Sequence, residues 1–171
     1  MDQQVERSGR DKVLRGLATR LRSCKLERTK STFFVRPATF AIEFVHLHKF
    51  SFTAGFRIHA GIRVLVDPFD AVALNGPDSD PYRSPNSPNG KRYHLSYARD
   101  GDSIGRCADN AAAWCLDVAE PWFERWRDLE SLASHANSPL DPAAKHALKQ
   151  ALAGSIDPDL VARSRAMLGL P

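Results

Sequence analysis

Residues 56–64 alternate strictly between apolar side chains and charged, polar or glycine residues, and no other stretch of the chain restricts the fold as strongly. A repeat of two residues is typical of a β-strand that packs one face on a core, because successive side chains point to opposite faces. The apolar set is Phe56, Ile58, Ala60, Ile62 and Val64. We therefore predict that Arg57, His59 and Arg63 project to the other face of a β-sheet.

Three further strands are predicted around this one. Residues 32–36 form a short apolar run that Pro37 ends, and residues 40–44 alternate in the same way as the first strand. Residues 93–97 alternate again further along the chain. The glycine-containing segment 51–55 is short enough to be a hairpin loop, so we expect the strands on either side of it to pair antiparallel.

The register of that hairpin is predicted from the side chains that would face each other. Pairing Phe44 with Ile62 places apolar residues together on the core face, and the same register sets Glu43 opposite Arg63 as a cross-strand ion pair. A slip of one residue would move Phe44 away from the core face. We therefore expect the first register.

Helices are predicted before and after the strands. Apolar residues recur every three or four positions from Asp11 to about Cys24, which predicts an amphipathic helix. The same spacing extends from a cap at residue 102 or 103 to Trp126, with Pro121 predicting a kink or a new helix.

Three Asp-Pro pairs mark further helix starts, because aspartate caps a helix N-terminus and proline suits its first turn. The pair at 67–68 predicts one or two helical turns. The pairs at 141–142 and 157–158 predict two short helices that pack together as a hairpin.

The order of these elements predicts an α+β fold. An N-terminal amphipathic helix precedes an antiparallel sheet of about four strands, and a long helix from the C-terminal half covers one face of the sheet. We expect residues 1–136 to form a single α+β domain with a Pro-rich loop at 75–90, followed by a C-terminal helical hairpin tail at 137–171. The second face of the sheet is then partly open, with the Pro-rich loop as a gate or contact.

Charge is distributed unevenly along the chain. Residues 1–63 hold 13 Lys and Arg against 5 Asp and Glu, a net charge of +8, whereas residues 64–171 hold 11 against 15, a net charge of −4. The basic part can attract nucleic acid, an anionic membrane or an acidic protein, and the acidic part can equally be its intramolecular counterpart.

The apolar runs are a few residues long, far below the about 20 residues of a membrane-spanning helix, and the N-terminus is polar. The sequence therefore predicts a cytoplasmic protein without a membrane partner. Cys24, Cys107 and Cys115 lack the spacing of a zinc site or a disulfide framework, and we predict that they are buried, reduced thiols.

Four segments share one resemblance. They read Phe-Phe-Val-Arg at 33–36, Ile-Glu-Phe-Val-His-Leu at 42–47, Phe-Arg-Ile-His-Ala-Gly-Ile at 56–62 and Glu-Pro-Trp-Phe at 120–123. Together they resemble a bacterial family known only as domain of unknown function 4304, over roughly residues 8–135. His59 and Ala60 stand where that family has Asn and Leu. The resemblance implies a bacterial protein and assigns no activity, cofactor or site residue.

The predicted open face of the sheet carries basic side chains. Guanidinium groups bind phosphate and carboxylate through paired hydrogen bonds, so this face can hold an anionic ligand or a protein partner. Alternatively, it is a solvated face on which each ion pair contributes only about 0 to 1 kcal/mol. The candidate binding residues are Arg57, His59 and Arg63, with Arg36 and Lys49 beside them.

His46 and His48 are two residues apart, so both point to one face of a strand, a spacing that can chelate zinc, nickel or copper. His59 would join them only in a slipped register, and no carboxylate motif accompanies them. We therefore predict structural histidines, with no metal and no other cofactor.

The absence of nucleotide, phosphate-loop and nucleophile motifs in the sequence favours a non-enzymatic binding module. A hydrolase that uses His59 and Arg63 is one alternative. Nucleic-acid binding is the other, although no DNA-binding or RNA-reading motif is present. The residues that would attract a phosphate backbone are Lys12, Arg15, Arg22, Arg28 and Lys30.

Overall fold

The computed structural model describes residues 3–51, 53–80, 92–98 and 100–171. The first half contains α1 (Gln3–Arg20), the 3₁₀ turn η1 (Leu21–Cys24), β1 (Glu27–Arg28), β2 (Phe33–Pro37), β3 (Ala41–Lys49) and β4 (Phe56–Val64). The second half contains α2 (Gly101–Trp114), the π-helical turn η2 (Cys115–Ala119), α3 (Glu120–Arg125), α4 (Leu129–Ser134), α5 (Pro142–Leu152) and α6 (Pro158–Met167). The strands form one antiparallel sheet in the order β1-β2-β3-β4, which confirms the predicted α+β class.

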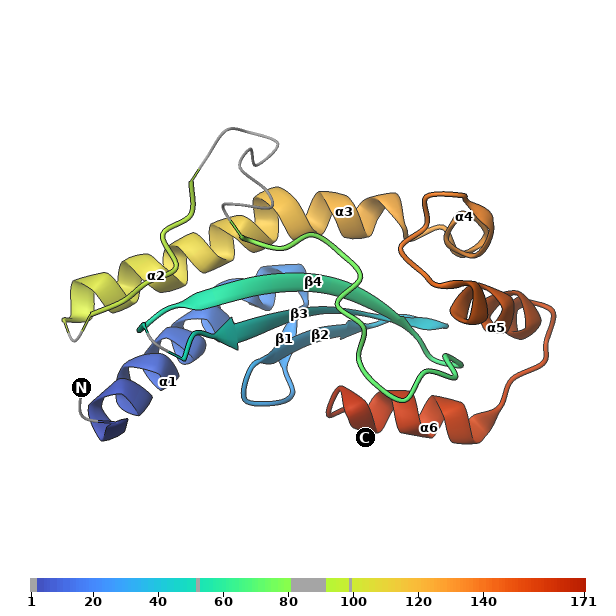
Figure 1. Cartoon of the computed structure of the whole chain (residues 1–171), viewed down its shortest axis with the longest axis horizontal. Coiled ribbons are helices and arrows are strands. Elements are labelled where there is room, and N and C mark those ends of the chain that lie inside the picture. Colours follow the sequence, from blue (N-terminus) through green and yellow to red (C-terminus); the bar gives the residue numbers. More distant parts are fainter. Residues whose placement is uncertain (1–2, 52, 81–91, 99) are drawn as a thin grey trace.

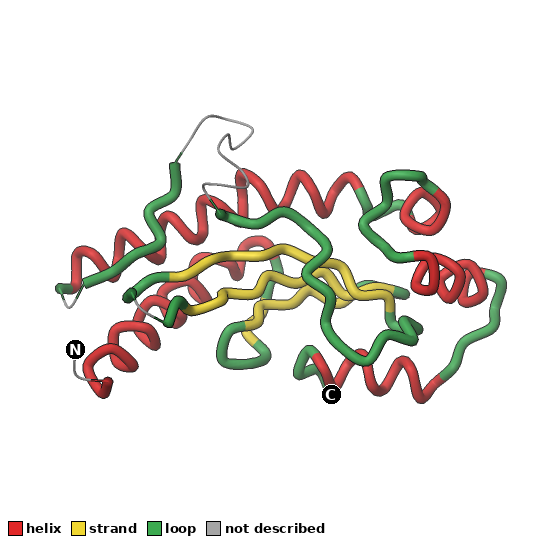
Figure 2. Tube along the Cα trace, viewed as in Figure 1, coloured by secondary structure: helices red, strands yellow, loops and turns green. Residues whose placement is uncertain are grey.

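The sheet lies between helices on both sides. Figures 1 and 2 show α2 and α3 running along one side of it and α6 on the opposite side. The face towards α2 is called the first face below, and the face towards α6 the second face. α1 packs against α2 and begins at Gln3, eight residues before the predicted start at Asp11.

The first face carries the main core, and its β4 residues are those predicted to point inward. The central members of this core are Leu14, Leu17, Val45, Leu47, Ile58, Ala60, Ala108 and Ala111.

The cap of α2 is Asp100, whose carboxylate accepts a hydrogen bond from the backbone N–H of Ser103, so the helix starts slightly before the predicted cap.

The predicted register of the hairpin is wrong by one residue. Glu43 pairs with Ile62, and Phe44 pairs with Gly61. Phe44 therefore lies on the second face, not in the main core. Alternation could not reveal this, because residues 41–45 are all buried and both faces of β3 are covered.

The predicted strand at 93–97 does not join the sheet. It makes a single bridge between Ser96 and Gly55, and it alternates because Leu95 and Tyr97 are buried in the main core. The fourth strand is β1, whose two residues are too few to produce a pattern. Residues 75–79 hydrogen-bond along the outer edge of β4, whereas residues 81–90 of the predicted Pro-rich loop lie outside the described residues.

Pro121 is accommodated by a π-helical turn. At the end of η2 the backbone N–H of Glu120 bonds to the carbonyl of Cys115, five residues earlier. Proline has no backbone N–H and would break the regular hydrogen bonding of an α-helix. The wider turn just before Pro121 changes the hydrogen-bond spacing, so the helix can continue through the proline. The backbone stays helical from α2 through η2 into α3, so Pro121 starts no separate helix, and Glu120 lies on the first turn of α3.

The second face carries a smaller core beneath α6. Both predicted tail helices form, with Asp141 and Asp157 as their caps. They do not pair as a hairpin, because α5 packs against α4 while α6 docks on the sheet. The buried residues of this second core are Val35, Ile42, Phe44, Leu65 and Leu168.

Candidate functional site

The structure does not bring the five predicted binding residues together. Arg57, His59 and Arg63 share the second face, as their alternation predicts. The register places Arg36 and Lys49 on the first face instead, because Arg36 pairs with Glu43 and Lys49 pairs with Phe56. The predicted basic cluster is therefore divided between two faces.

Arg63 is buried, so the second face is not open there. Its side chain is 1% exposed, and its guanidinium donates to Ser164 Oγ of α6 at 2.9 Å and to the carbonyl of Ala71 at 2.6 Å. Burial lowers its pKa. Arg63 also donates hydrogen bonds to the backbone carbonyls of Asp67 and Phe69. In a helix these carbonyls would accept hydrogen bonds from backbone N–H groups of the same helix. The helical turns predicted after Asp67 are accordingly absent from the described residues.

The other end of the second face is not strongly basic. Arg57 forms an ion pair with Asp80 at 2.8 Å. His46 lies opposite His59 and stacks on Phe33 at 4.4 Å between ring centroids. Burial, followed by the neighbouring charges of His59 and His48, lowers the pKa of His46 to about 4, so this imidazole is neutral at pH 7.

The register does bring His46 and His59 together, contrary to the expected pairing. Even so, within the described ranges no group of three or more His, Cys, Asp or Glu side chains is arranged to hold a metal ion.

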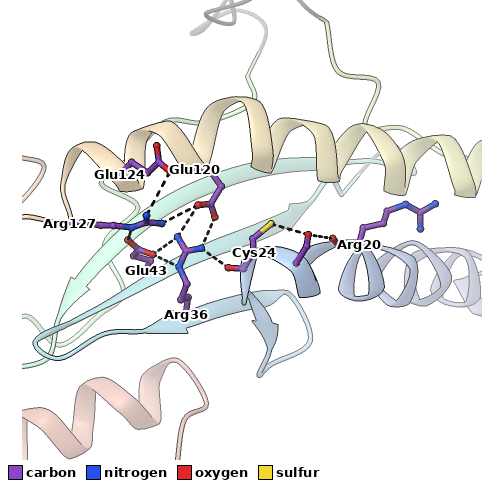
Figure 3. Close-up of polar contacts among 8 residues, drawn as sticks. Arg20, Cys24, Arg36, Glu43, Glu120, Glu124 and Arg127 are labelled. Carbon is purple, nitrogen blue, oxygen red and sulfur yellow. Dashed lines mark hydrogen bonds and ion pairs between the residues drawn. The ribbon is translucent and has the colours of Figure 1, made fainter.

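A pocket of about 460 Å³, lined in part by charged side chains, opens on the first-face side of the sheet. We call it the Arg36 pocket. Figure 3 shows its charged side chains converging from β2, β3 and α3. The lining residues are Ser23, Cys24, Lys25, Arg36, Pro37, Ala38, Glu43, Glu120 and Arg127.

Arg36 fixes the inner wall of the pocket. It donates to both carboxylate oxygens of Glu120, at 2.8 and 3.1 Å, and to Glu43 Oε2 at 2.5 Å. It also donates to the carbonyl of Cys24, where the chain turns through Lys25 at φ 58°. Burial alone would lower the pKa of Arg36, but the bonds to Glu120 and Glu43 raise it above its ordinary value.

Arg127 covers the two carboxylates from the solvent side. Its nitrogens lie 3.6 Å from Glu43 Oε1 and 3.3 Å from Glu120 Oε2, and it also reaches Glu124 at 3.8 Å. Its side chain is 50% exposed, whereas those of Glu43 and Glu120 are 10% and 16% exposed. Arg127 is thus an exposed cation on two nearly buried anions.

Local structure explains how these groups meet. Arg36 and Glu43 are direct cross-strand partners on the first face, the arrangement in which opposite charges attract best. Glu120 reaches them because α3 begins directly after the π-helical turn. The inner wall of Arg36, Glu43 and Glu120 carries one excess negative charge, which Arg127 balances.

Of the residues in this site, the sequence predicts only Arg36 as a binding residue. The predicted register pairs Glu43 with Arg63, and no pattern in the sequence links Glu120 or Arg127 to them. One signal was present, since Glu43 is the only charged residue in the apolar run from Ala41 to Leu47. Its partner Glu120 could not be inferred, because Arg36 and Glu120 are 84 residues apart.

No protein-family model matches the chain, and no curated protein or solved structure is significantly similar to it. No helix in the part of the chain that the structure describes is long and apolar enough to cross a bilayer.

Proposed function

We propose that the protein is a non-enzymatic binding module whose recognition site is the Arg36 pocket. Its ligand is a cationic group, a guanidinium or ammonium, carried by a partner protein or a small molecule. The observation that carries this proposal is the half-exposed Arg127 on the nearly buried carboxylates of Glu43 and Glu120. An incoming guanidinium can replace Arg127 on the same oxygens.

The inner wall favours a cation over an anion, because it holds two carboxylates and one guanidinium; Lys25 also lines the pocket and adds a positive charge beside that wall. An anion would draw Arg127 away and leave the inner wall with an uncompensated negative charge, which is costly for nearly buried groups. A cation keeps the balance and releases Arg127 to solvent. Bidentate pairing also suits a carboxylate to a planar guanidinium, which makes arginine the favoured side chain.

A binding role fits these carboxylates better than acid–base catalysis. Both are already held by guanidinium groups, and proton transfer would require breaking those pairs.

The Arg36 pocket takes the place of the predicted basic sheet face as the binding surface, because Arg63 is buried and Arg57 is paired. A cytoplasmic location and the resemblance to the bacterial family stay predictions from the sequence.

The proposal is tested with acetyl-arginine methylamide, a guanidinium probe without a carboxylate, and its neutral analogue acetyl-citrulline methylamide. Binding is measured by NMR titration. We expect the wild type to bind only the cationic probe. Arg127→Ala removes the internal competitor, worth about 1 kcal/mol for its ion pairs together, and should tighten binding about fivefold.

Arg125→Ala is the matched control, since the guanidinium of Arg125 lies over the ring of Trp126, 5.0 Å from its centroid. It should leave the affinity unchanged. The proposal fails if both probes bind equally, or if removing Arg127 does not tighten binding of the cationic probe.

A further inference from the structure

Internal ion pairs offset part of the uneven charge of the chain. Each pair joins an arginine of the basic first 63 residues to a carboxylate from the acidic remainder. The nearly buried pair of Arg36 with Glu120 links residues that are 84 positions apart, whereas Arg63 and Asp67 are close in sequence. The pairs are Arg20 with Asp109, Arg36 with Glu120, Arg57 with Asp80, and Arg63 with Asp67.

Among the cations of the same basic part whose side chains the structure describes, four make neither an ion pair nor a hydrogen bond. Lys12, Arg15, Arg22 and Lys25 are exposed, and none of these side chains has an ion pair or hydrogen bond within the described residues. The first three follow one side of α1 and η1, with the exposed Thr19 between them. We call the four residues the cationic stripe.

We infer that the cationic stripe binds the phosphate backbone of nucleic acid. From Lys12 to Arg22 the stripe extends about 16 Å, at roughly 1.5 Å per α-helical and 2.0 Å per 3₁₀ residue. That length corresponds to about five base-pair steps of 3.4 Å, so several charges can meet phosphates along one strand. The contact carries no base-reading element and is indifferent to sequence.

A membrane surface is the less favoured partner. Helices that lie on lipid insert apolar side chains between the headgroups. Among the described side chains of α1 and η1, the large apolar residues Val13, Leu14, Leu17 and Leu21 are fully buried in the main core. The stripe can therefore attract a lipid surface only by its positive charge. Positive charge is sufficient to bind the phosphate backbone of nucleic acid.

The test uses a fluorescein-labelled DNA duplex of mixed sequence and measures anisotropy at increasing KCl concentration. Neutralising about four phosphates predicts that the logarithm of the binding constant falls with a slope of about −3 to −4 against the logarithm of salt. The stripe variant is Lys12→Glu with Arg15→Glu and Arg22→Glu. Lys25 is left in place because it lines the Arg36 pocket.

The control variant changes net charge equally at exposed cations elsewhere, with Arg106→Glu, Arg125→Glu and Lys149→Glu. We expect the stripe variant to lose at least about tenfold in affinity and the control to lose much less, because attraction is strongest for charges close to the phosphates. Circular dichroism checks that both variants fold.

Three results would overturn the inference. The first is equal weakening by both variants, which indicates net charge alone. The second is a salt slope near zero. The third is wild-type binding to phosphatidylserine-containing vesicles with no binding to DNA, which indicates a membrane partner. None of these results bears on the Arg36 pocket, which the stripe variant leaves intact.

Discussion

The ring of Phe44 lies over Gly61, its cross-strand partner, in the space that a side chain at position 61 would occupy. A Cβ atom built on Gly61 would be 2.2 Å from Cζ of Phe44. The glycine therefore lets an aromatic ring cross β4 on the second face. It also explains the observed register, because a slip would place a side chain beneath the ring.

Gly61→Ala should destabilise the protein. The added methyl group forces Phe44 out of its site in the second core, and overpacking of this kind costs about 1 to 3 kcal/mol. Urea unfolding measures the loss. Gly105→Ala is the matched control, since Gly105 lies within α2 with nothing within 4 Å of a built Cβ.

At Gly105 the same change should stabilise the protein by about 0.5 to 1 kcal/mol, because alanine favours a helix. If alanine at 61 is as well tolerated as alanine at 105, Phe44 does not depend on the glycine and the register explanation is wrong.

These residues also show how far the sequence predicts the fold. Alternation in β4 correctly places Arg57, His59 and Arg63 on one face, because every second residue of that strand belongs to the main core. In β3 both faces are covered, so hydrophobicity could not indicate which face Phe44 occupies. The register depends on a long-range fit that no local pattern expresses.

Arg36→Met should cost about 3 to 5 kcal/mol of unfolding free energy, because it leaves two nearly buried carboxylates without their principal partner. Chemical denaturation provides the measurement. Arg127→Met is the matched control on the same carboxylates, and its exposed pairs should cost no more than about 1 kcal/mol. Equal losses for the two variants would contradict the distinction between the inner wall and its cover.

His46 should make stability fall as the solution becomes acidic. Its pKa is about 4 in the folded protein and 6.5 as the ordinary value. Above pH 6.5 the imidazole is neutral in both states. Between pH 6.5 and 4 only the unfolded chain gains the proton, so unfolding becomes easier. After allowance for partial solvent exposure the loss is about 1 to 2 kcal/mol.

The measurement compares urea midpoints from pH 7.5 to 4.5 for the wild type, His46→Gln and His48→Gln. His46→Gln should flatten the profile most, and His48→Gln only slightly, since His48 is exposed and its charge is the smallest of the causes that lower the pKa of His46. Parallel profiles for all three proteins would exclude His46 as the source of acid sensitivity.

Leu168→Ala should destabilise the second core by about 2 to 4 kcal/mol, because the residue is fully buried and its loss leaves a cavity. Ile156→Ala, at a side chain 49% exposed, should change stability little. Thermal unfolding compares the two. A Leu168→Ala protein as stable as the wild type would mean that α6 is not firmly docked on the sheet.

The candidate site was less predictable than the fold for a physical reason. Capping and alternation act within a few residues, and they located α5, α6 and β4. The Arg36 pocket instead combines β2, β3 and α3, and its geometry depends on where a π-helical turn ends. The prediction that Arg63 is exposed was wrong because its burial beneath α6 depends on tertiary packing, which local patterns do not show.

The most direct test of the proposed function is to follow the side-chain carboxyl carbons of Glu43 and Glu120 by ¹³C NMR during titration with acetyl-arginine methylamide. A site in which the probe replaces Arg127 predicts saturable shifts of these two signals, with the Arg127 Nε–H signal moving towards that of a free arginine. Unchanged glutamate signals while the probe binds elsewhere would contradict a cation site in the Arg36 pocket.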